Sequence, residues 1–343
     1  MLVGLLEPLK VKGLILKNRI VMPPMHTGLA TTEGAVTDEL IEHYTRRSKA
    51  LGLLIVEHSY VSLDGRRSER QLGICNDGLV AGLEKLCSSV HATGTPVAIQ
   101  INHAGRRAST EITGTRPVAP SRIGDARKLR VDEIEALIEA FAVAAERAMR
   151  AGFDGVELHG AHGYLLNQFF SPITNRRRDK YGGSLQNRMR FPLEVVERVK
   201  ERVGRRLLLY RLGSDDLHPE GIKIEDSMKF AMKLEEVGVE VIDVSGGLCG
   251  DGSAQFQDIQ GYFVPQAKKI KEVVNVPVIG VGGITDPIYA NKLIKEGQID
   301  LVAVGRVLLR DPDWAIKSIK ILGARKDPSG IELGFLECYK NQL

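Results

Sequence analysis

The chain has 343 residues, with 47 Lys and Arg against 43 Asp and Glu, a net charge of +4, and 43% hydrophobic residues. This composition is ordinary for a globular protein and excludes a disordered tail protein, a collagen and a coiled coil. No apolar run approaches the ~18–20 residues of a membrane span, and acidic residues are interspersed among the basic ones, unlike the dense patch of nucleic-acid binders. We therefore expect no membrane and no nucleic-acid partner. The first ten residues show no secretory signal, so we expect a cytoplasmic protein.

Short apolar runs alternate with longer amphipathic stretches along the whole chain. Strands are expected at Asn18–Met22, Leu53–Glu57, Val97–Ile101, Gly155–Leu158, Leu207–Arg211, Val239–Val244, Val276–Gly280 and Asp300–Val304. Helices are expected from the N-cap Thr37 to Ala50 and at Leu79–His91, Asp132–Ala151, Leu185–Val203, Ile224–Val237, Tyr262–Val273 and Pro287–Glu296, with a last one after Asp311.

Three of the joints between helix and strand repeat one pattern. Gly152, Gly238 and Gly297 each follow a helix, where glycine takes the left-handed C-terminal conformation without strain. An unbroken apolar run comes next, which is typical of parallel strands covered by helices. Eight such strand–helix units predict a (β/α)8 TIM barrel, and we expect a single domain over residues 1–343. A doubly wound open sheet is the alternative, but no GxGxxG or GxxxxGK[ST] turn follows any strand.

In a barrel of this kind the chemistry lies after the C-terminal ends of the strands. Gly282, Gly283 and Gly305 stand at the ends of the seventh and eighth strands, where glycine lets backbone N–H groups approach a phosphate closely. Arg306 can add a charge-assisted hydrogen bond to the same anion. The pattern predicts a phosphorylated ligand, and the alternative is that these are turn glycines beside a surface arginine.

Two polar residues lie at the ends of apolar strands. Arg211 ends the fifth strand, and a buried guanidinium needs an anionic or strongly polar partner. The N1–C2=O edge of a flavin is one such partner, and an ion pair with Asp215, Asp216 or Glu157 is the alternative. Gln100, at the end of the third strand, offers a donor and an acceptor that match a flavin pyrimidine edge.

His159, His162 and Tyr164 follow the fourth strand. Two imidazoles on one loop can donate hydrogen bonds to a single carbonyl or nitro oxygen, and the phenol of Tyr164 is suited to protonating a carbanion. A metal pair is the rival interpretation, but there is no HExxH helix and no evident third ligand, so we expect no metal. A polar loop and an aromatic packing residue are the remaining alternatives.

The sequence HGAHGYLLNQF at 159–169, followed by RDKYGGS at 178–184 and Asn187–Arg188, resembles the old yellow enzyme family of FMN-dependent NAD(P)H:flavin oxidoreductases. The resemblance implies that His159 and His162 hold a substrate carbonyl oxygen and that Tyr164 protonates the alkene. It also implies an FMN across the barrel mouth, surrounded by Pro23, Pro24, Met25, His26, His58, Gln100, Arg211, Gly282, Gly283, Gly305 and Arg306.

The segment Met25–Leu29 departs from the ene-reductases of thermophilic type, which have a cysteine where this chain has His26. It is more similar to the barrel domain of 2,4-dienoyl-CoA reductases, which continue into an iron–sulfur cluster. Here a single cysteine, Cys338, stands near the end, and one cysteine cannot hold a four-cysteine cluster. We therefore expect NAD(P)H to reduce FMN directly. The other cysteines, Cys75, Cys87 and Cys249, form no CxxC pair, and free thiols are expected.

The expected function is reduction of an activated C=C bond, in an enone, enal or related small molecule, with hydride from NADH or NADPH in a ping-pong reaction. The resemblance further implies a homo-oligomer, a dimer or a tetramer. The segment Arg106–Asp125 is expected to cover the site. Two other functions remain open: a flavin-independent, phosphate-binding barrel lyase or isomerase, and a flavin-binding protein without turnover.

Overall fold

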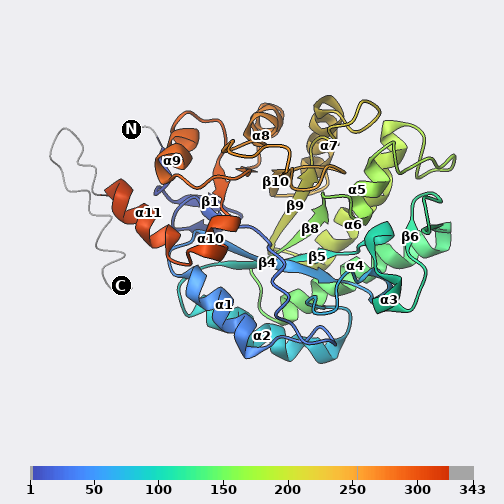
Figure 1. Cartoon of the computed structure of the whole chain (residues 1–343), viewed down its shortest axis with the longest axis horizontal. Coiled ribbons are helices and arrows are strands. Elements are labelled where there is room, and N and C mark those ends of the chain that lie inside the picture. The colour runs from blue at the N-terminus through green and yellow to red at the C-terminus, as the bar shows by residue number, and fades with distance from the viewer. Residues whose placement is uncertain (1–2, 253, 324–343) are drawn as a thin grey trace.

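The computed structural model describes residues 3–252 and 254–323, so Cys338 lies outside the described residues. Within them, eight parallel strands close into a barrel whose order around the ring follows the order along the chain (Figure 1). The strands are β3 (Ile20–Met22), β4 (Leu53–Tyr60), β5 (Val97–Asn102), β8 (Gly155–Gly160), β9 (Leu207–Gly213), β10 (Val241–Ser245), β11 (Val278–Gly280) and β12 (Leu301–Ala303). The predicted (β/α)8 barrel is therefore confirmed.

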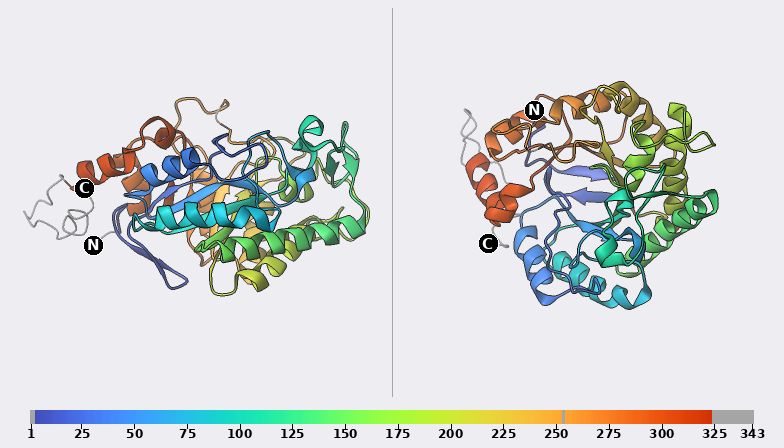
Figure 2. Two further views of the ribbon diagram at one scale, coloured as in Figure 1. Left: turned by 90° about the horizontal axis from the view of Figure 1, so that it is seen from below. Right: turned by 45° about the vertical axis from the view of Figure 1, so that its right-hand side comes forward.

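Helices follow the strands and surround them as an outer ring, which is visible in the right-hand view of Figure 2. They are α1 (Asp38–Ser48), α2 (Val80–His91), α4 (Val131–Arg150), α6 (Leu185–Val203), α7 (Ile224–Glu236), α8 (Val264–Lys271), α9 (Pro287–Lys295) and α11 (Trp314–Gly323). The Oγ1 of Thr37 accepts a hydrogen bond from the backbone N–H of Leu40 at 3.2 Å, so the predicted N-cap of α1 is confirmed. In the part of the chain that is described, no helix combines the length and the apolar character needed to cross a bilayer.

The structure extends some predicted elements and adds short ones. Strands β8 and β9 run two residues further than predicted because their pairing continues through His159 opposite Arg211 and Gly160 opposite Leu212. The elements that the periodicity missed have too few residues to show a period. They are β1 (Leu9–Val11), β2 (Leu14–Leu16), β6 (Val118–Ala119), β7 (Arg127–Lys128), α3 (Thr110–Thr113), α5 (Leu165–Phe170), α10 (Arg306–Arg310) and the 3₁₀ turns Leu63–Gly65, Asp77–Leu79 and Gly105–Arg107.

The barrel interior is apolar at one end and polar at the other. Val11 and Leu16 of the β1–β2 hairpin share a buried cluster with inward residues of the strands such as Leu53 and Leu209. Each fully buried side chain of this size contributes roughly 1.5–3 kcal/mol to folding. Toward the carboxyl ends of the strands, buried polar residues replace the apolar ones. The change in polarity along the barrel axis places the chemistry at the carboxyl end.

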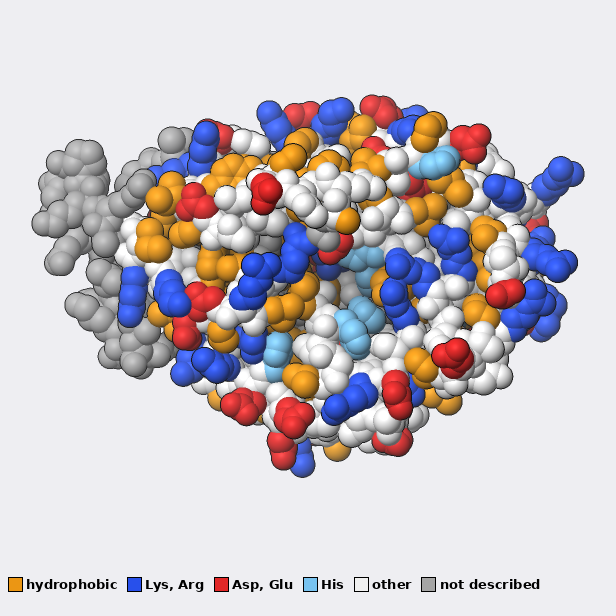
Figure 3. Space-filling view, viewed as in Figure 1, with side chains coloured by type: hydrophobic (Ala, Val, Ile, Leu, Met, Phe, Trp, Pro, Cys, Tyr) orange, Lys and Arg blue, Asp and Glu red, His pale blue; other side chains and the backbone are white. Residues whose placement is uncertain are grey.

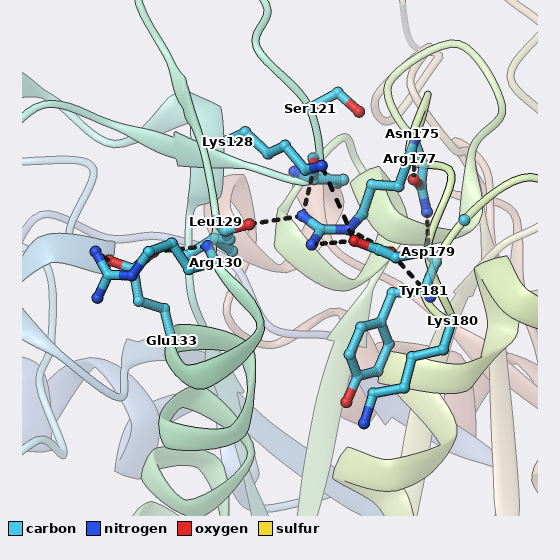
Figure 4. Close-up of polar contacts among 12 residues, drawn as sticks. Ser121, Lys128, Leu129, Arg130, Glu133, Asn175, Arg177, Asp179, Lys180 and Tyr181 are labelled. Atoms are coloured by element: carbon cyan, nitrogen blue, oxygen red, sulfur yellow. Dashed lines mark hydrogen bonds and ion pairs between the residues drawn. The ribbon is translucent and has the colours of Figure 1, made fainter.

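The buried side chain of Arg177 binds the segment that connects β5 to α4 (Figure 4). Arg177 is 3% exposed and donates from Nη1 to the carbonyl oxygens of Pro120 and Leu129 at 2.8 and 2.7 Å. Its Nη2 lies 2.8 Å from a carboxylate oxygen of Asp179. Because removing any partner would leave a buried charge or carbonyl unsatisfied, this contact holds the segment firmly. The RDKYGGS motif and the residues just before it are therefore part of a structural clamp.

Candidate active site

A cavity of about 550 Å³ opens at the carboxyl ends of β11 and β12. Seven of the predicted flavin residues line it: Pro23, Met25, Arg211, Gly282, Gly283, Gly305 and Arg306. Ser245, Phe256 and Tyr262 line it as well and were not predicted. Pro24, His26, His58 and Gln100 are not among its lining residues. Figure 3 shows the face of the molecule on which histidine side chains gather in a hollow bordered by Lys and Arg.

The glycine side of the cavity needs residues without a side chain. Gly282 has φ +123°, and a Cβ there would lie 2.7 Å from the backbone nitrogen of Tyr262. Gly283 has φ +64°, and a Cβ at Gly305 would lie 2.8 Å from the Sδ of Met25. Glycine at these positions therefore lets neighbouring segments pack more closely than a side chain would allow, and all three residues line the cavity. The structure brings the three predicted glycines to one cavity, and their role as a phosphate site stays a prediction.

Arg306 lies at the edge of this glycine surface. Its Nη2 donates to the hydroxyl of Tyr262 at 2.8 Å, and its Nη1 lies 3.5 Å from a carboxylate oxygen of Asp251. The guanidinium also stands over the Tyr262 ring, 5.9 Å from its centroid. The side chain is 35% exposed, so the positive charge is held in place but remains accessible to an anion in the cavity.

Four polar residues fill the barrel below the cavity. Gln100 donates from Nε2 to Oε1 of Glu157 at 2.8 Å, and its own Oε1 is buried without a hydrogen-bond partner. The Nε of Arg211 lies 3.2 Å from Oδ2 of Asp243. The alternative ion-pair partner of Arg211 expected from the sequence was Asp215, Asp216 or Glu157. The structure corrects that alternative, because the ion pair is with Asp243. Asp243 pairs with it because the residue lies directly opposite on the next strand.

Burial controls the charge of the two carboxyl groups in this layer. Glu157 and Asp243 are both 0% exposed. Burial raises the pKa of Glu157 well above its ordinary value, and the neighbouring carboxyl of Asp243 raises it further. Burial also raises the pKa of Asp243, although Arg211 opposes that shift.

His159, His162 and Tyr164 come together as predicted. The ring centroids of His159 and His162 are 5.1 Å apart, and those of His159 and Tyr164 are 4.7 Å apart. Burial lowers the pKa of each histidine well below its ordinary value. For His159 the next cause is His162, and for His162 it is Arg211, since each disfavours a further positive charge. Both rings are therefore neutral at neutral pH.

The backbone of His162 is held in an unusual conformation. Its φ is +57°, a left-handed value that costs a non-glycine residue of order 1–3 kcal/mol. Its N–H donates to the carbonyl oxygen of Gly246 at 3.0 Å, and Arg107 donates to its own carbonyl oxygen. The Nε2 of the ring is 2.7 Å from the hydroxyl of Ser245. These contacts hold the ring against Ser245, one of the residues that line the cavity.

Two arginines that the sequence reasoning missed flank Tyr164. Arg67 donates from Nη1 to the Tyr164 hydroxyl at 3.2 Å. The guanidinium carbons of Arg67 and Arg107 lie 5.8 and 5.5 Å from the centre of the Tyr164 ring. Positive charge at these positions favours negative charge on the phenol oxygen. The only sequence signal was a basic residue in each of two loops after strands, which is too common to interpret.

His26 and His58 stack with a centroid separation of 5.4 Å. The Nδ1 of His26 is 2.9 Å from Oε2 of the buried Glu57, and its Nε2 is 3.1 Å from the Ser68 hydroxyl. Gln71 lies with its Nε2 2.8 Å from Nδ1 of His58. Burial, and then the neighbouring His26, lower the pKa of His58 to about 3. His58 is therefore neutral and accepts at Nδ1, which leaves its Nε2–H as a donor.

Comparisons with known proteins identify the chain's family. Residues 4–322 match the model of the NADH:flavin oxidoreductase / NADH oxidase family. The chain belongs to this family. It is 42% identical over 327 residues to a Geobacillus NADPH dehydrogenase, covering 93% of this chain and 94% of that protein. It is 44% identical over 322 residues to an NADH oxidase of Thermoanaerobacter brockii, of which it spans only 50% while 90% of this chain is covered.

Solved structures agree with this family assignment. The old yellow enzyme homologue of Zymomonas mobilis matches with a TM-score of 0.83 at 28% identity, over 93% of each chain. Morphinone reductase in complex with tetrahydroNAD matches with a TM-score of 0.82 at 30% identity, over 96% of this chain and 94% of that one. The predicted resemblance to old yellow enzymes is confirmed, as is the class, an NAD(P)H-dependent flavin oxidoreductase with FMN as cofactor.

The residues of this flavin oxidoreductase fit an FMN. Gly282, Gly283 and Arg306 line one cavity, where backbone N–H groups and a guanidinium suit a phosphate. Arg211 and Gln100, whose Oε1 has no partner, offer a cation, a donor and an acceptor to a pyrimidine edge. Within residues 3–252 and 254–323, no three His, Cys, Asp or Glu side chains gather as metal ligands. Cys75, Cys87 and Cys249 are free thiols.

The segment after β5 contributes a second, separate cavity. It measures about 450 Å³ and is lined by Arg106, Arg107, Ala108, Thr110, Pro117, Ile123, Gly124, Asp125 and Ala126. Arg107 links this cavity to the site because the same side chain binds the carbonyl of His162 and stands over Tyr164. The predicted covering segment Arg106–Asp125 thus contacts the site residues through Arg107.

Proposed function

We propose that this flavin oxidoreductase reduces the C=C bond of small alkenes activated by a carbonyl or nitro group. The observation that carries the proposal is the group His159, His162 and Tyr164: two neutral imidazoles and one phenol converge beside the cavity that Arg211 lines. A neutral pair of donors is suited to a carbonyl oxygen, and a phenol held nearby is suited to supply a proton.

The proposed FMN position combines residues that line the cavity with Pro24, His26, His58 and Gln100, which lie outside its lining. We place its phosphate at Gly282, Gly283, Gly305 and Arg306, and its pyrimidine edge at Gln100 and Arg211. Pro23, Pro24, Met25, His26 and His58 then border the remaining edge of the ring. When bound, FMN supplies the hydride chemistry, and the protein contributes binding, orientation and charge.

The two histidines hold the substrate oxygen in this proposal. The backbone N–H of Ala161 points at Nδ1 of His159 at 3.4 Å, so the ring hydrogen belongs on Nε2. For His162, a hydroxyl proton donated by Ser245 to Nε2 leaves an Nδ1–H. Both rings then present one N–H to the same oxygen. Because neither ring needs to be charged, this polarisation is available throughout the neutral pH range.

Tyr164 donates the proton in this proposal, and Arg67 assists it. When the phenol gives up its proton, its oxygen becomes negative, and the guanidinium of Arg67 is already 3.2 Å away. A hydrogen bond from a charged donor is about twice as strong as a neutral one. Arg67 therefore stabilises the product of proton donation more than the reactant, which is what a catalytic contact must do.

We further propose that the nicotinamide and the alkene occupy this site in turn, which gives ping-pong kinetics. Two relatives carry names that describe oxidation of a nicotinamide alone, NADH oxidase and NADPH dehydrogenase. One morphinone reductase structure holds tetrahydroNAD. These names support reduction by a nicotinamide, and the alkene half of the reaction is supported by the His–His–Tyr group.

The test separates the two half-reactions by anaerobic stopped flow on the yellow holoprotein. NADPH and NADH are each expected to bleach the flavin absorbance, and 2-cyclohexenone is expected to restore it. Cyclohexanone, which lacks the C=C bond, is the matched control and should not restore it. Reoxidation by oxygen alone, with none by any enone, enal or nitroalkene, would contradict the proposal. Release of FAD instead of FMN on acid precipitation would contradict the cofactor site.

A further inference from the structure

The polar layer below the cavity contains more carboxyl groups than cations. Glu157 on β8 and Asp243 on β10 lie on either side of Arg211 on β9, and all three point into the barrel interior. Gln100 on β5, His58 on β4, and His159 and His162 on and after β8 also lie around this layer. Gln100 carries no charge, and burial keeps the three histidines neutral. On β11 and β12 the inward residues at this end are apolar, Ile279 and Leu301. One guanidinium thus faces two buried carboxyl groups.

The hydrogen bonds of this layer are also short of donors. Oε1 of Glu157 accepts from Gln100, but Oε2 of Glu157 and both oxygens of Asp243 are buried with no hydrogen-bond partner. The ion pair between Arg211 and Asp243 lacks hydrogen-bond geometry at Nε. Two ionised carboxylates would leave a net negative charge in a buried layer, with three oxygens that have no donor from the protein. A proton on one carboxyl removes the excess charge and adds the missing donor.

We propose that Glu157 and Asp243 share a single proton, so that these two groups and Arg211 together form a neutral unit under the flavin. Arg211 is then balanced by one negative charge, and the two carboxyl residues act as positioning residues through it. The effect on the flavin rests on the proposed function, because it assumes that the pyrimidine edge lies over Arg211. The inference that the two carboxyl groups share one proton rests only on the buried residues of this layer and does not depend on where the flavin binds.

Replacing the carboxyl groups one at a time and then together tests the charge balance. In Glu157→Gln or Asp243→Asn, the remaining carboxyl ionises and still balances Arg211, so the flavin reduction equilibrium should change less than threefold. In the double variant the guanidinium is unbalanced and favours the reduced, more negative flavin. We expect a shift of at least about tenfold toward reduction, or ~30 mV upward for a two-electron couple. This strong non-additivity distinguishes one shared proton from two independent carboxylates.

Infrared spectroscopy of the apoprotein detects the protonated carboxyl group in the absence of flavin. The wild type should show the carbonyl band of a protonated carboxylic acid at neutral pH, and each single variant should lose it. Asp216→Asn is the matched control: Asp216 is a buried carboxylate that already accepts from Ser171, Ile222 and Leu248, so its removal should leave the band. If Asp243→Asn does not fold, Glu157→Gln alone tests the proposal through the lost band and unchanged potential.

Two results would overturn the shared proton: no such band in the wild type, or equal upward shifts of potential in both single variants that add in the double. A different result isolates the proposed flavin placement. If the band behaves as expected and the double variant keeps the wild-type potential, the shared proton is supported and the flavin does not lie over Arg211.

Discussion

The two sides of the barrel mouth recognise their ligands by different means. On the side of β11 and β12, the site consists of Gly282, Gly283 and Gly305 together with the cations Arg306 and Arg310. On the side of β4 and β8, it consists of packed rings, and His159 contacts both His162 and Tyr164. The glycine side has the features of a permanent phosphate site, and the histidine side those of a site for reactants that exchange.

This difference predicts which property each side controls. Substitutions on the glycine side should change how tightly FMN is held and leave the chemistry of bound flavin intact. Substitutions on the histidine side should change the reaction with alkene while FMN stays bound. A variant that changed FMN affinity and the reaction with alkene to the same degree would show that the two sides do not have separate roles.

The largest effect is expected from Tyr164→Phe, which removes the hydroxyl and keeps the ring. Flavin reduction by NADPH should stay near normal, since hydride transfer to the flavin needs no proton from this residue. Reoxidation by 2-cyclohexenone should slow by ~10²–10⁴-fold, the usual contribution of a general acid. Stopped-flow absorbance measures both rates. Tyr181→Phe is the control, because its hydroxyl contacts Glu194 in the structural clamp. Equal slowing of both half-reactions, or no slowing with the enone, would show that another group supplies the proton.

A smaller effect of the same kind is expected from Arg67→Met. The hydrogen bond from a charged donor to the Tyr164 hydroxyl contributes ~1.5–3 kcal/mol, so enone reduction should slow by ~10–100-fold. The effect should disappear in the Tyr164→Phe background, because Arg67 acts through that oxygen. Arg70→Met, on the same loop but bonded to the carbonyl of Ala30, should react like the wild type. Persistence of the full Arg67 effect without the hydroxyl would show a separate role in substrate binding.

The glycine side should respond in FMN affinity. Gly283→Ala places a methyl group 3.2 Å from the ring of Tyr262 and 3.5 Å from Arg306, which would crowd both at the proposed phosphate site. We expect FMN to bind about tenfold more weakly, the loss of roughly one hydrogen bond. Gly297→Ala is a matched control, since Gly283 and Gly297 have φ of +64° and +67° and pay the same backbone strain. A Cβ at Gly297 meets nothing within 4 Å. Fluorescence titration of the apoproteins with FMN measures the difference. Equal weakening in both variants would assign the effect to strain.

Much of this site could be predicted from sequence because the barrel rule links position along the chain to position in space. Arg211 and Gly282 lie far apart in sequence, yet both follow or end apolar strands, and both line one cavity. The partner of Arg211 could not be found in this way. The run VIDVS contains the signal, a carboxyl residue inside a buried strand, but the register that places Asp243 opposite Arg211 appears only when β9 and β10 pair.

The residues around Tyr164 were missed for a different reason. Arg67 and Arg107 lie in connecting segments after different strands, and no sequence pattern predicts the direction of an arginine side chain in such a segment. The RDKYGGS motif served to recognise the family, but its structural role was not predicted. Arg177, just before it, and Asp179 within it hold the segment after β5 in place. A sequence motif identifies the family. Which of its residues take part in the reaction and which stabilise the fold becomes clear only from the packed structure.

The smallest effect is expected from pH, because His159 and His162 are both neutral. Burial lowers their pKa well below the ordinary 6.5, so neither ring should change charge between pH 6 and 8. The KM for 2-cyclohexenone should vary less than twofold over this range. Tightening of enone binding as the pH falls through 6.5 would show instead that a charged imidazole holds the oxygen, and the histidine side would then work by charge, as the glycine side does.

The pH dependence of folding stability gives an independent test of the protonation state of His159 and His162. In the unfolded chain they take up protons near pH 6.5, and in the folded chain they do not, so their contribution to stability is complete above pH 6.5 and is lost as the pH falls below it. The loss between pH 6.5 and 5 is at most about 2 kcal/mol for each histidine. A His159→Asn/His162→Asn double variant should therefore show a smaller fall in Tm over this interval than the wild type. His218→Asn, at an exposed position, should show the wild-type fall. If the double variant fell as steeply as the wild type, the two rings would take up protons in the folded protein as readily as in the unfolded chain, and burial would not keep the pair neutral as the pH falls.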